Sequence, residues 1–238
     1  MTIEYSGIFP TFNDFVEIDQ DKPHLISVFG KKGSGKSVWA RSMYTSWDDD
    51  KLGIDVNGDM EPGHDAVIIM DPLPDSFPSN PTGEPVNLHY LADPGSPTYR
   101  EDLDRAIGLG LFPKEHRTLL WIDEIGEFTT GNRTDPRMRR LLHQSRHFNT
   151  SAIMCGPRPT DVDKLIIAQS DLVVIYDLPD PDDQAKIAKI IAYPADRFGK
   201  IIAEMRSLGP HHHLVYAASK CTRSGRPQLA LCDPLDLA

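Results

Sequence analysis

The feature that most constrains the fold of this chain is a glycine-rich segment at residues 29–39, FGKKGSGKSVW. It fits the pattern G-x-x-x-x-G-K-[ST] at every fixed position, and its eight motif residues are Gly30, Lys31, Lys32, Gly33, Ser34, Gly35, Lys36 and Ser37. A short apolar run at residues 24–29 precedes the motif, and residues 37–47 have the apolar spacing of a helix. A glycine loop between a strand and a helix is the context in which this pattern marks a phosphate-binding loop.

The residue types in this loop predict the chemistry of its ligand. The glycines allow backbone N–H groups to turn inward around phosphates, and the start of a helix adds favourable electrostatics toward an anion. All eight residues are expected to surround the nucleotide, with Lys36 at the β- and γ-phosphate oxygens and the Ser37 hydroxyl on Mg²⁺. The alternative is a glycine-rich turn that carries a surface lysine, which leaves the flanking strand and helix unexplained. We therefore predict a site for ATP and Mg²⁺.

A second segment, TLLWIDEIGEF at residues 118–128, supplies an acidic pair. Four apolar residues from Leu119 to Ile122 predict a buried strand that ends in Asp123 and Glu124. An acid at the carboxyl end of a buried parallel strand lies at the same edge of the sheet as a phosphate loop. We expect Asp123 to bind the Mg²⁺ shell through water and Glu124 to act as general base on the attacking water. The alternative is that the pair only caps a turn, but a complete phosphate loop in the same chain argues for catalysis.

Strand patterns alternate with helix patterns, which favours an α/β fold with a mostly parallel central sheet flanked by helices. Strands are expected at residues 24–29, 51–59, 64–71, 117–124, 150–156, 171–178, 212–219 and 228–234. Helices are expected at residues 37–47, 98–112, 135–148, 160–169, 181–193 and 194–205. We interpret residues 1–24 as an irregular lead-in, residues 25–238 as one domain, and residues 72–98 as an irregular excursion rich in Pro and Gly.

Composition excludes several classes of protein. The 238 residues are enough for one good core. We see no apolar run near the roughly 20 residues of a membrane span, and no secretory signal at the N-terminus. Three cysteines without metal-type spacing predict reduced thiols in a cytosolic compartment. A net charge of −10 argues against a surface covered by nucleic acid, although a local basic patch remains compatible with it.

Residues 139–178, RRLLHQSRHFNTSAIMCGPRPTDVDKLIIAQSDLVVIYDL, form the stretch most specific for function. Arg146 comes near the end of a helix, and an apolar strand, a Pro-Arg-Pro segment, a helix and a second apolar strand follow it. In this order the chain resembles the FtsK–HerA superfamily of ring-forming, DNA-pumping ATPases, over about residues 25–192. Its small size looks most like the genome-packaging ATPases of tailless, internal-membrane phages and viruses. The assembly proteins of filamentous phages are also similar, but they carry a membrane span.

The resemblance implies a RecA-like P-loop NTPase fold of the ASCE type and ATP hydrolysis that drives translocation of double-stranded DNA. It also implies a homo-oligomeric ring, with a hexamer favoured, in the host cytoplasm or on the virion, beside a capsid vertex or portal protein. Arg146 matches the finger that reaches the γ-phosphate of a neighbouring subunit, where such a residue is worth about 10³–10⁵ in rate. One departure concerns a glutamine that usually senses the γ-phosphate: Pro157 stands at that place and has no side-chain donor. Arg158, Thr160 and Gln144 are candidate substitutes.

Other charged residues leave alternatives open. Arg133, Arg137 and Arg139 either line a DNA pore through phosphate contacts or form a solvated basic helix face. Two further functions are compatible with the sequence: a plasmid or mobile-element DNA translocase, and an ATP-dependent switch that binds only protein. The acidic net charge and the missing glutamine keep the switch open as an alternative. The three histidines at residues 211–213 are interpreted as the start of a strand, because adjacent strand residues point to opposite faces.

Overall fold

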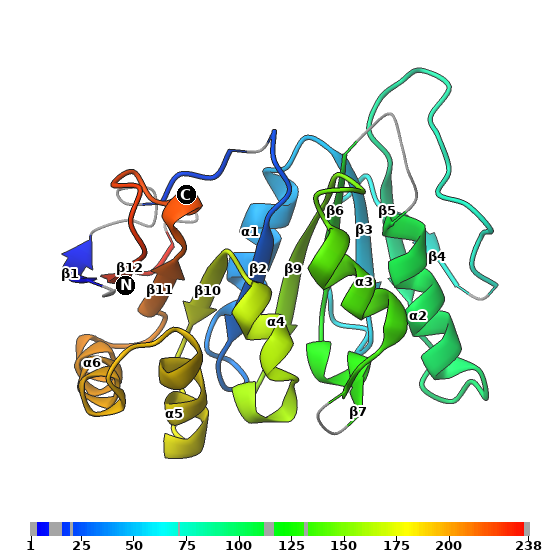
Figure 1. Cartoon of the computed structure of the whole chain (residues 1–238). Helices are drawn as coiled ribbons and strands as arrows, with labels where there is room; N and C mark the ends of the chain where they lie inside the picture. Colours follow the sequence, from blue (N-terminus) through cyan, green and yellow to red (C-terminus); the bar gives the residue numbers. More distant parts are fainter. Residues whose placement is uncertain are drawn as a thin grey trace.

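The computed structural model describes residues 4–9, 16–19, 21–70, 72–111, 117–130 and 133–235. Parts of the expected lead-in and the ends of the elements expected at 64–71 and 98–112 lie outside these described residues. The chain is organised around a ten-stranded sheet with the order β1-β12-β11-β10-β2-β9-β6-β3-β5-β4 (Figure 1). A second sheet contains only the short strands β7 and β8.

The strands of the large sheet are β1 (Glu4–Phe9), β2 (Leu25–Phe29), β3 (Asp50–Asp55), β4 (Val67–Ile69), β5 (Asn87–Leu91), β6 (Thr118–Ile122), β9 (Thr150–Gly156), β10 (Leu172–Ile175), β11 (His213–Ala217) and β12 (Gln228–Cys232). The small sheet pairs β7 (Thr129–Thr130) with β8 (Arg133–Thr134). The helices are α1 (Lys36–Thr45), α2 (Tyr99–Gly110), α3 (Pro136–Gln144), α4 (Lys164–Gln169), α5 (Pro181–Ile190) and α6 (Ala195–Leu208). Short 3₁₀ helices are η2 (Ile125–Phe128), η3 (Pro159–Asp161) and η4 (Ser219–Cys221).

Most neighbouring strands of the large sheet are parallel. Every pair from β10 through β2, β9, β6, β3 and β5 to β4 is parallel, and so is the pair of β1 with β12. β11 runs antiparallel to both of its neighbours. The expected α/β fold with a mostly parallel sheet and flanking helices is therefore confirmed. Because β2, β6, β9 and β10 point the same way, their carboxyl ends lie along one edge of the sheet.

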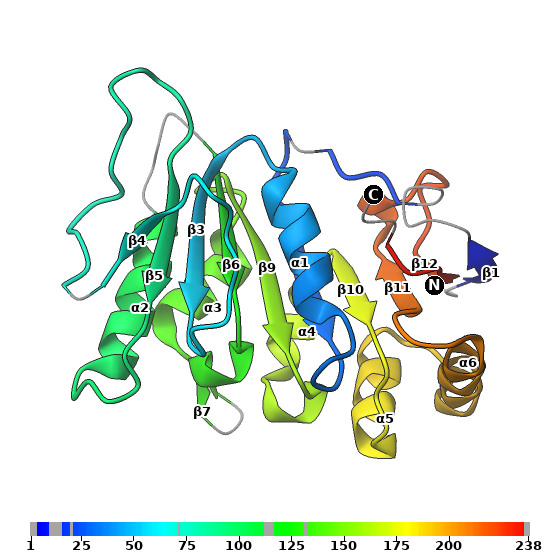
Figure 2. The ribbon, with the colours of Figure 1, turned by 180° about the vertical axis from the view of Figure 1, so that it is seen from behind.

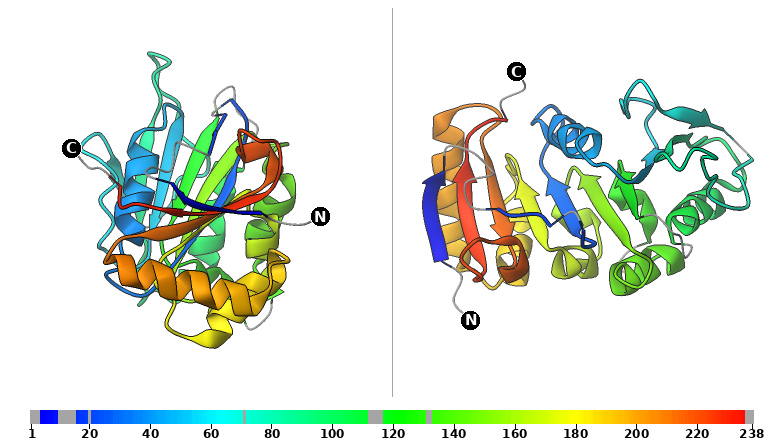
Figure 3. Two further views of the ribbon diagram at one scale, coloured as in Figure 1. Left: turned by 90° about the vertical axis from the view of Figure 1, so that its left-hand side faces the viewer. Right: turned by 90° about the horizontal axis from the view of Figure 1, so that it is seen from above.

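Two apolar cores cover the two faces of the sheet. Ile26 and Val28 of β2 contact the core that includes Trp39 and Tyr44 of α1, whereas their neighbour Phe29 contacts the core of the other face. This division follows from the alternation of side chains along a strand. Helices α2 to α6 contribute to the second core, opposite α1 (Figures 2 and 3). With both faces covered, the central strands are wholly buried, as is usual for parallel sheets.

Two expected irregular segments contain strands. The lead-in includes β1, which pairs in parallel with β12 at one end of the sheet, so the expectation that it is irregular is wrong. The excursion at 72–98 includes β5, which lies between β3 and β4. Apolar Val86, Leu88 and Tyr90 alternate with Asn87 and His89, which is a short strand pattern, but it lies in a segment rich in Pro, Gly and Asp that favours an irregular interpretation. Its backbone is held in the sheet by parallel pairing on both sides, a tertiary effect.

Other elements are shorter than expected. The strand expected at 51–59 ends at Asp55, where the carboxylate accepts backbone N–H bonds from Asn57 and Gly58 and closes a turn. The strand expected at 64–71 is reduced to Val67–Ile69 at the edge of the sheet. Helix α3 ends at Gln144, and Arg146 lies in the turn that follows.

Candidate functional site

The phosphate loop joins β2 to α1 at the carboxyl edge of the sheet, as the sequence predicts. Gly33 and Gly35 have φ angles of 76° and 109°, in the left-handed region that favours glycine. A Cβ atom on Gly30 would lie 2.5 Å from the Cβ of Tyr176, a contact that real side chains do not make. Gly35 is also the N-cap of α1 and has no side chain to satisfy the first N–H groups of that helix. The loop therefore presents free helix N–H groups, as an anion site requires.

The basic residues of the loop are held by backbone and acidic groups. Lys36 donates its Nζ to the carbonyl oxygen of Lys31 at 3.1 Å. Lys31 itself pairs with Asp177, with 2.6 Å between Nζ and the carboxylate. Burial lowers the pKa of Lys36, and the charges of Asp123 and Glu124 act in the opposite direction. Lys36 is thus a half-buried lysine whose ammonium group interacts with Asp123 and Glu124, as expected of a lysine that binds phosphate between the loop and the acidic pair.

The remaining loop residues line the rim of the site. Lys32, Gly33 and Ser37 are exposed, so the hydroxyl of Ser37 at the start of α1 is open to a ligand. Ser34 is buried, and its Oγ has no hydrogen-bond partner within the described chain. Its side chain lies near Gly30, where an added Cβ would be 2.8 Å from Oγ. All eight predicted residues thus lie in one continuous loop at one edge of the sheet.

Asp123 and Glu124 follow β6 directly, and one strand, β9, separates β6 from the strand of the phosphate loop. Burial raises the pKa of Asp123, the Asn57 side chain lowers it, and two neighbouring aspartates raise it. Burial, followed by the charge of Asp123, raises the pKa of Glu124 to about 7. A carboxylate with a raised pKa is a stronger base, which suits proton transfer from water. The structure therefore brings the acidic pair and the loop to the same edge.

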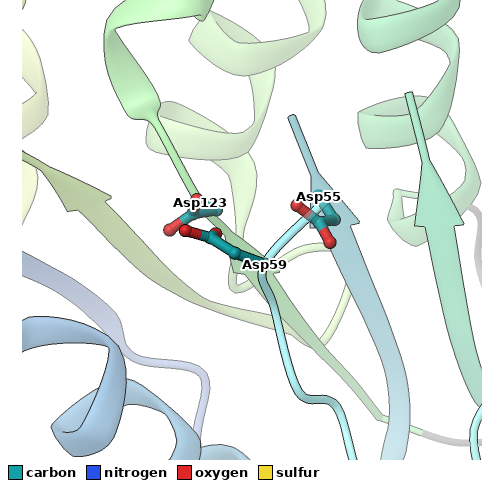
Figure 4. Close-up of side chains that lie close together, drawn as sticks. All are labelled: Asp55, Asp59 and Asp123. Atoms are coloured by element: carbon teal, nitrogen blue, oxygen red, sulfur yellow. The ribbon is translucent and has the colours of Figure 1, made fainter. Parts of the chain in front are cut away.

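Two polar side chains at this edge were missed or undervalued by the sequence analysis. Asn57 donates its Nδ2 to Asp123 at 3.0 Å. Asp59 lies with Asp55 and Asp123 in a group whose carboxylate oxygens are within 4.8 Å of one another (Figure 4). In the figure, Asp59 and Asp123 point toward each other from different elements. Asn57 and Asp59 approach Asp123 because β3 and β6 are neighbours in the sheet. No residue spacing in the sequence predicts this proximity.

Asp55 has a structural role within the same group. Its carboxylate accepts backbone N–H bonds from the following turn and contacts His89 Nε2 at 3.1 Å. Asp55 therefore caps the turn that follows β3. Asp59 and Asp123, by contrast, have carboxylate oxygens available to a cation, and Ser37 offers a hydroxyl. Such hard oxygen donors with excess negative charge fit Mg²⁺. Ser37 and Asp123 are the residues that would hold it.

Arg146 lies at the opposite edge of the sheet. It is exposed in the turn that leads into β9. It lines a cavity of about 680 Å³ together with Leu25, the first residue of β2, and Asp171, the residue before β10. The phosphate loop follows the other end of β2. Arg146 and the phosphate loop of the same chain therefore lie at opposite edges of the sheet.

The other arginines divide into paired and unpaired groups. Arg137 donates its backbone N–H and its guanidinium to Asp104. Arg140 lies over the Phe148 ring at 4.5 Å. Arg133 and Arg139 are exposed and have no ion pair among the described residues. Of the three arginines considered for a DNA pore, Arg137 fits that role least well, because it is bound to Asp104.

Pro157 follows β9 at the carboxyl edge, and the candidate substitutes for a sensor glutamine are engaged elsewhere. Arg158 pairs with Asp180 and with the buried Asp183, and Thr160 donates its hydroxyl to Asp183 at 2.6 Å. Gln144 accepts from Arg140 at the end of α3. Arg158 and Thr160 are therefore both held by Asp183, and Gln144 lies beside Arg146 at the edge opposite the phosphate loop.

The histidines after α6 have a place that the sequence analysis did not predict. His213 begins β11, as expected, but His211 lies against the phosphate loop, with Nδ1 3.1 Å from the carbonyl oxygen of Ser34. Arg206 of α6 pairs with Asp177, the partner of Lys31. No sequence motif connects residues so far apart; only the return of the chain through β11 places them at the loop.

Comparisons with known proteins were made at the level of sequence and of structure. No family model and no curated protein matches the sequence. The genome packaging NTPase B204 from Sulfolobus turreted icosahedral virus 2, in complex with sulfate, matches with 19% identity and a TM-score of 0.65, covering 91% of this chain and 98% of that one. The same protein in complex with AMPPCP matches with 18% identity and a TM-score of 0.64, covering 92% of this chain and 100% of that one.

A second kind of protein shares the fold. The pCW3 conjugation coupling protein TcpA, in its monomer form with ATPγS, matches with 14% identity and a TM-score of 0.51, covering 93% of this chain and 68% of that one. Among the described residues, no helix is long and apolar enough to cross a membrane. At these identities the likeness concerns the fold. The chain thus has the fold of the packaging NTPase B204 and of the coupling protein TcpA, and the P-loop NTPase fold implied by its sequence resemblance is confirmed.

Proposed function

We propose that the protein is a Mg²⁺-dependent ATPase that translocates double-stranded DNA and packages it into a viral capsid. The observation that carries this proposal is the joint placement of a complete phosphate loop and the pair Asp123–Glu124 at one edge of a sheet. The fold shared with a viral packaging NTPase supports the choice of substrate. The resemblance further favours a host-cytoplasmic or virion-associated ring that meets a capsid vertex or portal protein.

The mechanism follows from the residues at this edge. Lys36 and the loop N–H groups bind the phosphates and orient the terminal phosphoryl group. Glu124 accepts a proton from water, whose oxygen bonds to the γ-phosphorus as the bond to the β–γ bridging oxygen breaks and ADP leaves. Asn57 holds Asp123 in place through its 3.0 Å hydrogen bond. Mg²⁺, when bound at Ser37 and Asp123, would neutralise charge on the phosphates.

Completion of the site by a neighbour is the second part of the proposal. Arg146 is exposed, has no ion pair among the described residues, and lies at the edge opposite the loop. A ring of subunits arranged head to tail brings Arg146 of one subunit to the γ-phosphate of the next. A hexamer is the ring favoured by the resemblance.

DNA contact is the third part. A groove of about 840 Å³ is lined by Arg133, Arg139 and Lys164, which are all exposed and without ion pairs among the described residues. These cations can hold phosphates without reading base sequence. The hairpin β7–β8 connects Arg133 to the 3₁₀ helix after Glu124, and Thr134 donates to Asp163 at 3.0 Å on the far side of the groove. Changes at the acidic pair therefore reach the groove through a short segment.

The test is ATP turnover with and without long double-stranded DNA at low salt, for the wild type, Glu124→Gln and Arg146→Ala. DNA should raise wild-type turnover several-fold, and each substitution should reduce it by at least about 10². A mixture of the two variants should recover activity, because each supplies what the other lacks. Arg197→Ala, an exposed arginine on α6, is the matched control and should behave as wild type.

Two results would redirect the proposal. Turnover that ignores DNA at every salt concentration, but is lost in Glu124→Gln, would indicate an ATP-dependent switch that acts on a protein partner. If DNA stimulates ATP turnover and no capsid protein affects it, the result would fit a plasmid or mobile-element DNA translocase equally well. For the groove, the double variant Arg133→Gln/Arg139→Gln should reduce the slope of log affinity against log salt by about 1–2, and Arg137→Gln should not.

A further inference from the structure

A second cavity, of about 360 Å³, opens beside the phosphate loop. One wall consists of the loop residues Lys31, Gly33 and Ser34. The other wall comes from the end of α6 and the turn before β11, including Met205, Pro210 and His211. It lies on the β10 side of the loop, away from the acidic pair on β6. Its volume is within the range of small-ligand sites, and it is continuous with the residues that would hold phosphates.

The turn that forms the outer wall has an unusual backbone. His211 has a φ of 67°, in the left-handed region that a histidine seldom adopts, and Gly209 precedes it with a φ of 119°. This conformation places Nδ1 of His211 3.1 Å from the carbonyl oxygen of Ser34. Because a carbonyl oxygen only accepts, Nδ1 must carry the hydrogen. In the neutral ring Nε2 is then an acceptor, and no partner for it lies within the described chain.

The floor of the cavity is aromatic. Tyr176 lies beneath the loop, and a Cβ on Gly35 would be 3.2 Å from its ring. The buried ring of His213 stacks on Tyr176, with 5.2 Å between centroids and 28° between planes. Met205 adds a buried thioether to the wall. A planar, apolar group fits beside such a floor, and His211 Nε2 at the rim gives it orientation. The carboxylate of Asp177, which also lines the cavity, is already paired with Lys31 and Arg206.

We propose that this cavity binds the nucleoside of the triphosphate, and that His211 Nε2 accepts a hydrogen bond from a donor of adenosine. This rests on the proposed function, since the loop must first hold the phosphates. The donor is the 6-amino group of the base or a ribose hydroxyl. Either donor would lie beside the phosphate loop, because Lys31, Gly33 and Ser34 belong to that loop and also line the cavity. His211 is thus a specificity residue for the nucleotide.

The test uses a variant that changes only the free ring nitrogen. His211→Asn tolerates a positive φ and retains a donor at the position of Nδ1, but it has no acceptor at the position of Nε2. Affinities for ATP and for inorganic tripolyphosphate are measured by calorimetry in EDTA, which prevents hydrolysis. Loss of one hydrogen bond should weaken ATP binding about 10-fold, and tripolyphosphate binding should change less than about 2-fold. Inosine triphosphate lacks the 6-amino group and 2′-deoxy-ATP lacks one hydroxyl. If one of these analogues binds the wild type and the variant with equal affinity, the group that it lacks is the donor to His211 Nε2.

Three outcomes overturn the inference or its basis. Unchanged ATP affinity in His211→Asn refutes the role of Nε2. An equal loss for ATP and tripolyphosphate shows that His211 only shapes the loop. Lys36→Ala serves as the control for the phosphate site and should weaken both ligands. If it weakens neither, the proposed phosphate loop fails, independently of the nucleoside cavity.

Discussion

His213 provides the most quantitative prediction, because a buried neutral histidine makes stability depend on pH. Its side chain is fully buried at the start of β11, and its Nε2 has no hydrogen-bond partner within the described chain. Burial lowers the pKa of His213 to about 4, and the charge of His212 acts in the same direction. The hydrogen bond to the His211 carbonyl oxygen and the charge of Asp233 oppose this shift. The folded chain therefore resists protonation of this ring.

The sign and the size of the effect follow from linkage. Above pH 6.5 the ring is neutral in both the folded and the unfolded chain. Below pH 6.5 the unfolded chain binds a proton that the folded chain does not, so the free energy of unfolding falls until about pH 4. One pKa unit corresponds to about 1.4 kcal/mol, so the difference between 6.5 and about 4 predicts a loss of about 3 kcal/mol.

The assay is urea unfolding of the wild type and of His213→Phe between pH 7.5 and pH 4.5. Phenylalanine keeps a ring against Tyr176 but cannot bind a proton. Near pH 7 the variant should be less stable by about 1 kcal/mol, through loss of one hydrogen bond. At pH 4.5 it should gain about 2–3 kcal/mol relative to wild type. A difference between the two proteins that stays constant over this range would refute the reasoning, and His64→Asn, which removes an exposed histidine, should track the wild type.

Three further substitutions test the packing around the site. Gly30→Ala places a Cβ 2.5 Å from that of Tyr176, so we expect a loss of about 1–3 kcal/mol in urea unfolding and weaker nucleotide binding in calorimetry. Asp183→Ala removes a buried carboxylate that accepts from Arg158 and Thr160, and thermal unfolding should show a loss of about 2–4 kcal/mol. Ile68→Lys on the edge strand β4, where the side chain is 65% exposed, should change stability by less than about 0.5 kcal/mol and reduce aggregation seen by light scattering.

The parts of the fold that the sequence predicts are those with a strong local pattern. The strands β2, β6, β9 and β10 are continuous apolar runs that are buried on both faces, so their burial can be inferred without knowing their neighbours. The phosphate loop combines fixed glycine spacing with a flanking strand and helix, which makes its position in the sheet predictable. Asp123 and Glu124 follow from the same reasoning, because they end one of these strands.

The parts that the sequence does not predict depend on neighbours distant along the chain. β5 has only a short alternating pattern inside a segment rich in Pro and Gly, and pairing with β3 and β4 on both sides adds to its extended conformation. Asn57 approaches Asp123 only because β3 and β6 are adjacent. His211 approaches Ser34 because β11 returns antiparallel beside β10 and places the preceding turn at the carboxyl edge. In each case the contact is set by strand order, which local periodicity does not encode.

The charges of the two sheet edges bear on the proposed ring. At the carboxyl edge, Asp123, Glu124 and Asp59 lie close together, and burial adds to their mutual repulsion in raising the pKa of the first two. At the amino edge, the cavity at Arg146 is also lined by Arg140, His143 and Lys220. Opposite edges of one sheet cannot meet within the same subunit. In the proposed ring, a heterologous contact in which the basic edge of one copy faces the acidic edge of the next would bring these charges together. On the proposed function, ATP turnover should therefore rise with protein concentration more steeply than in proportion.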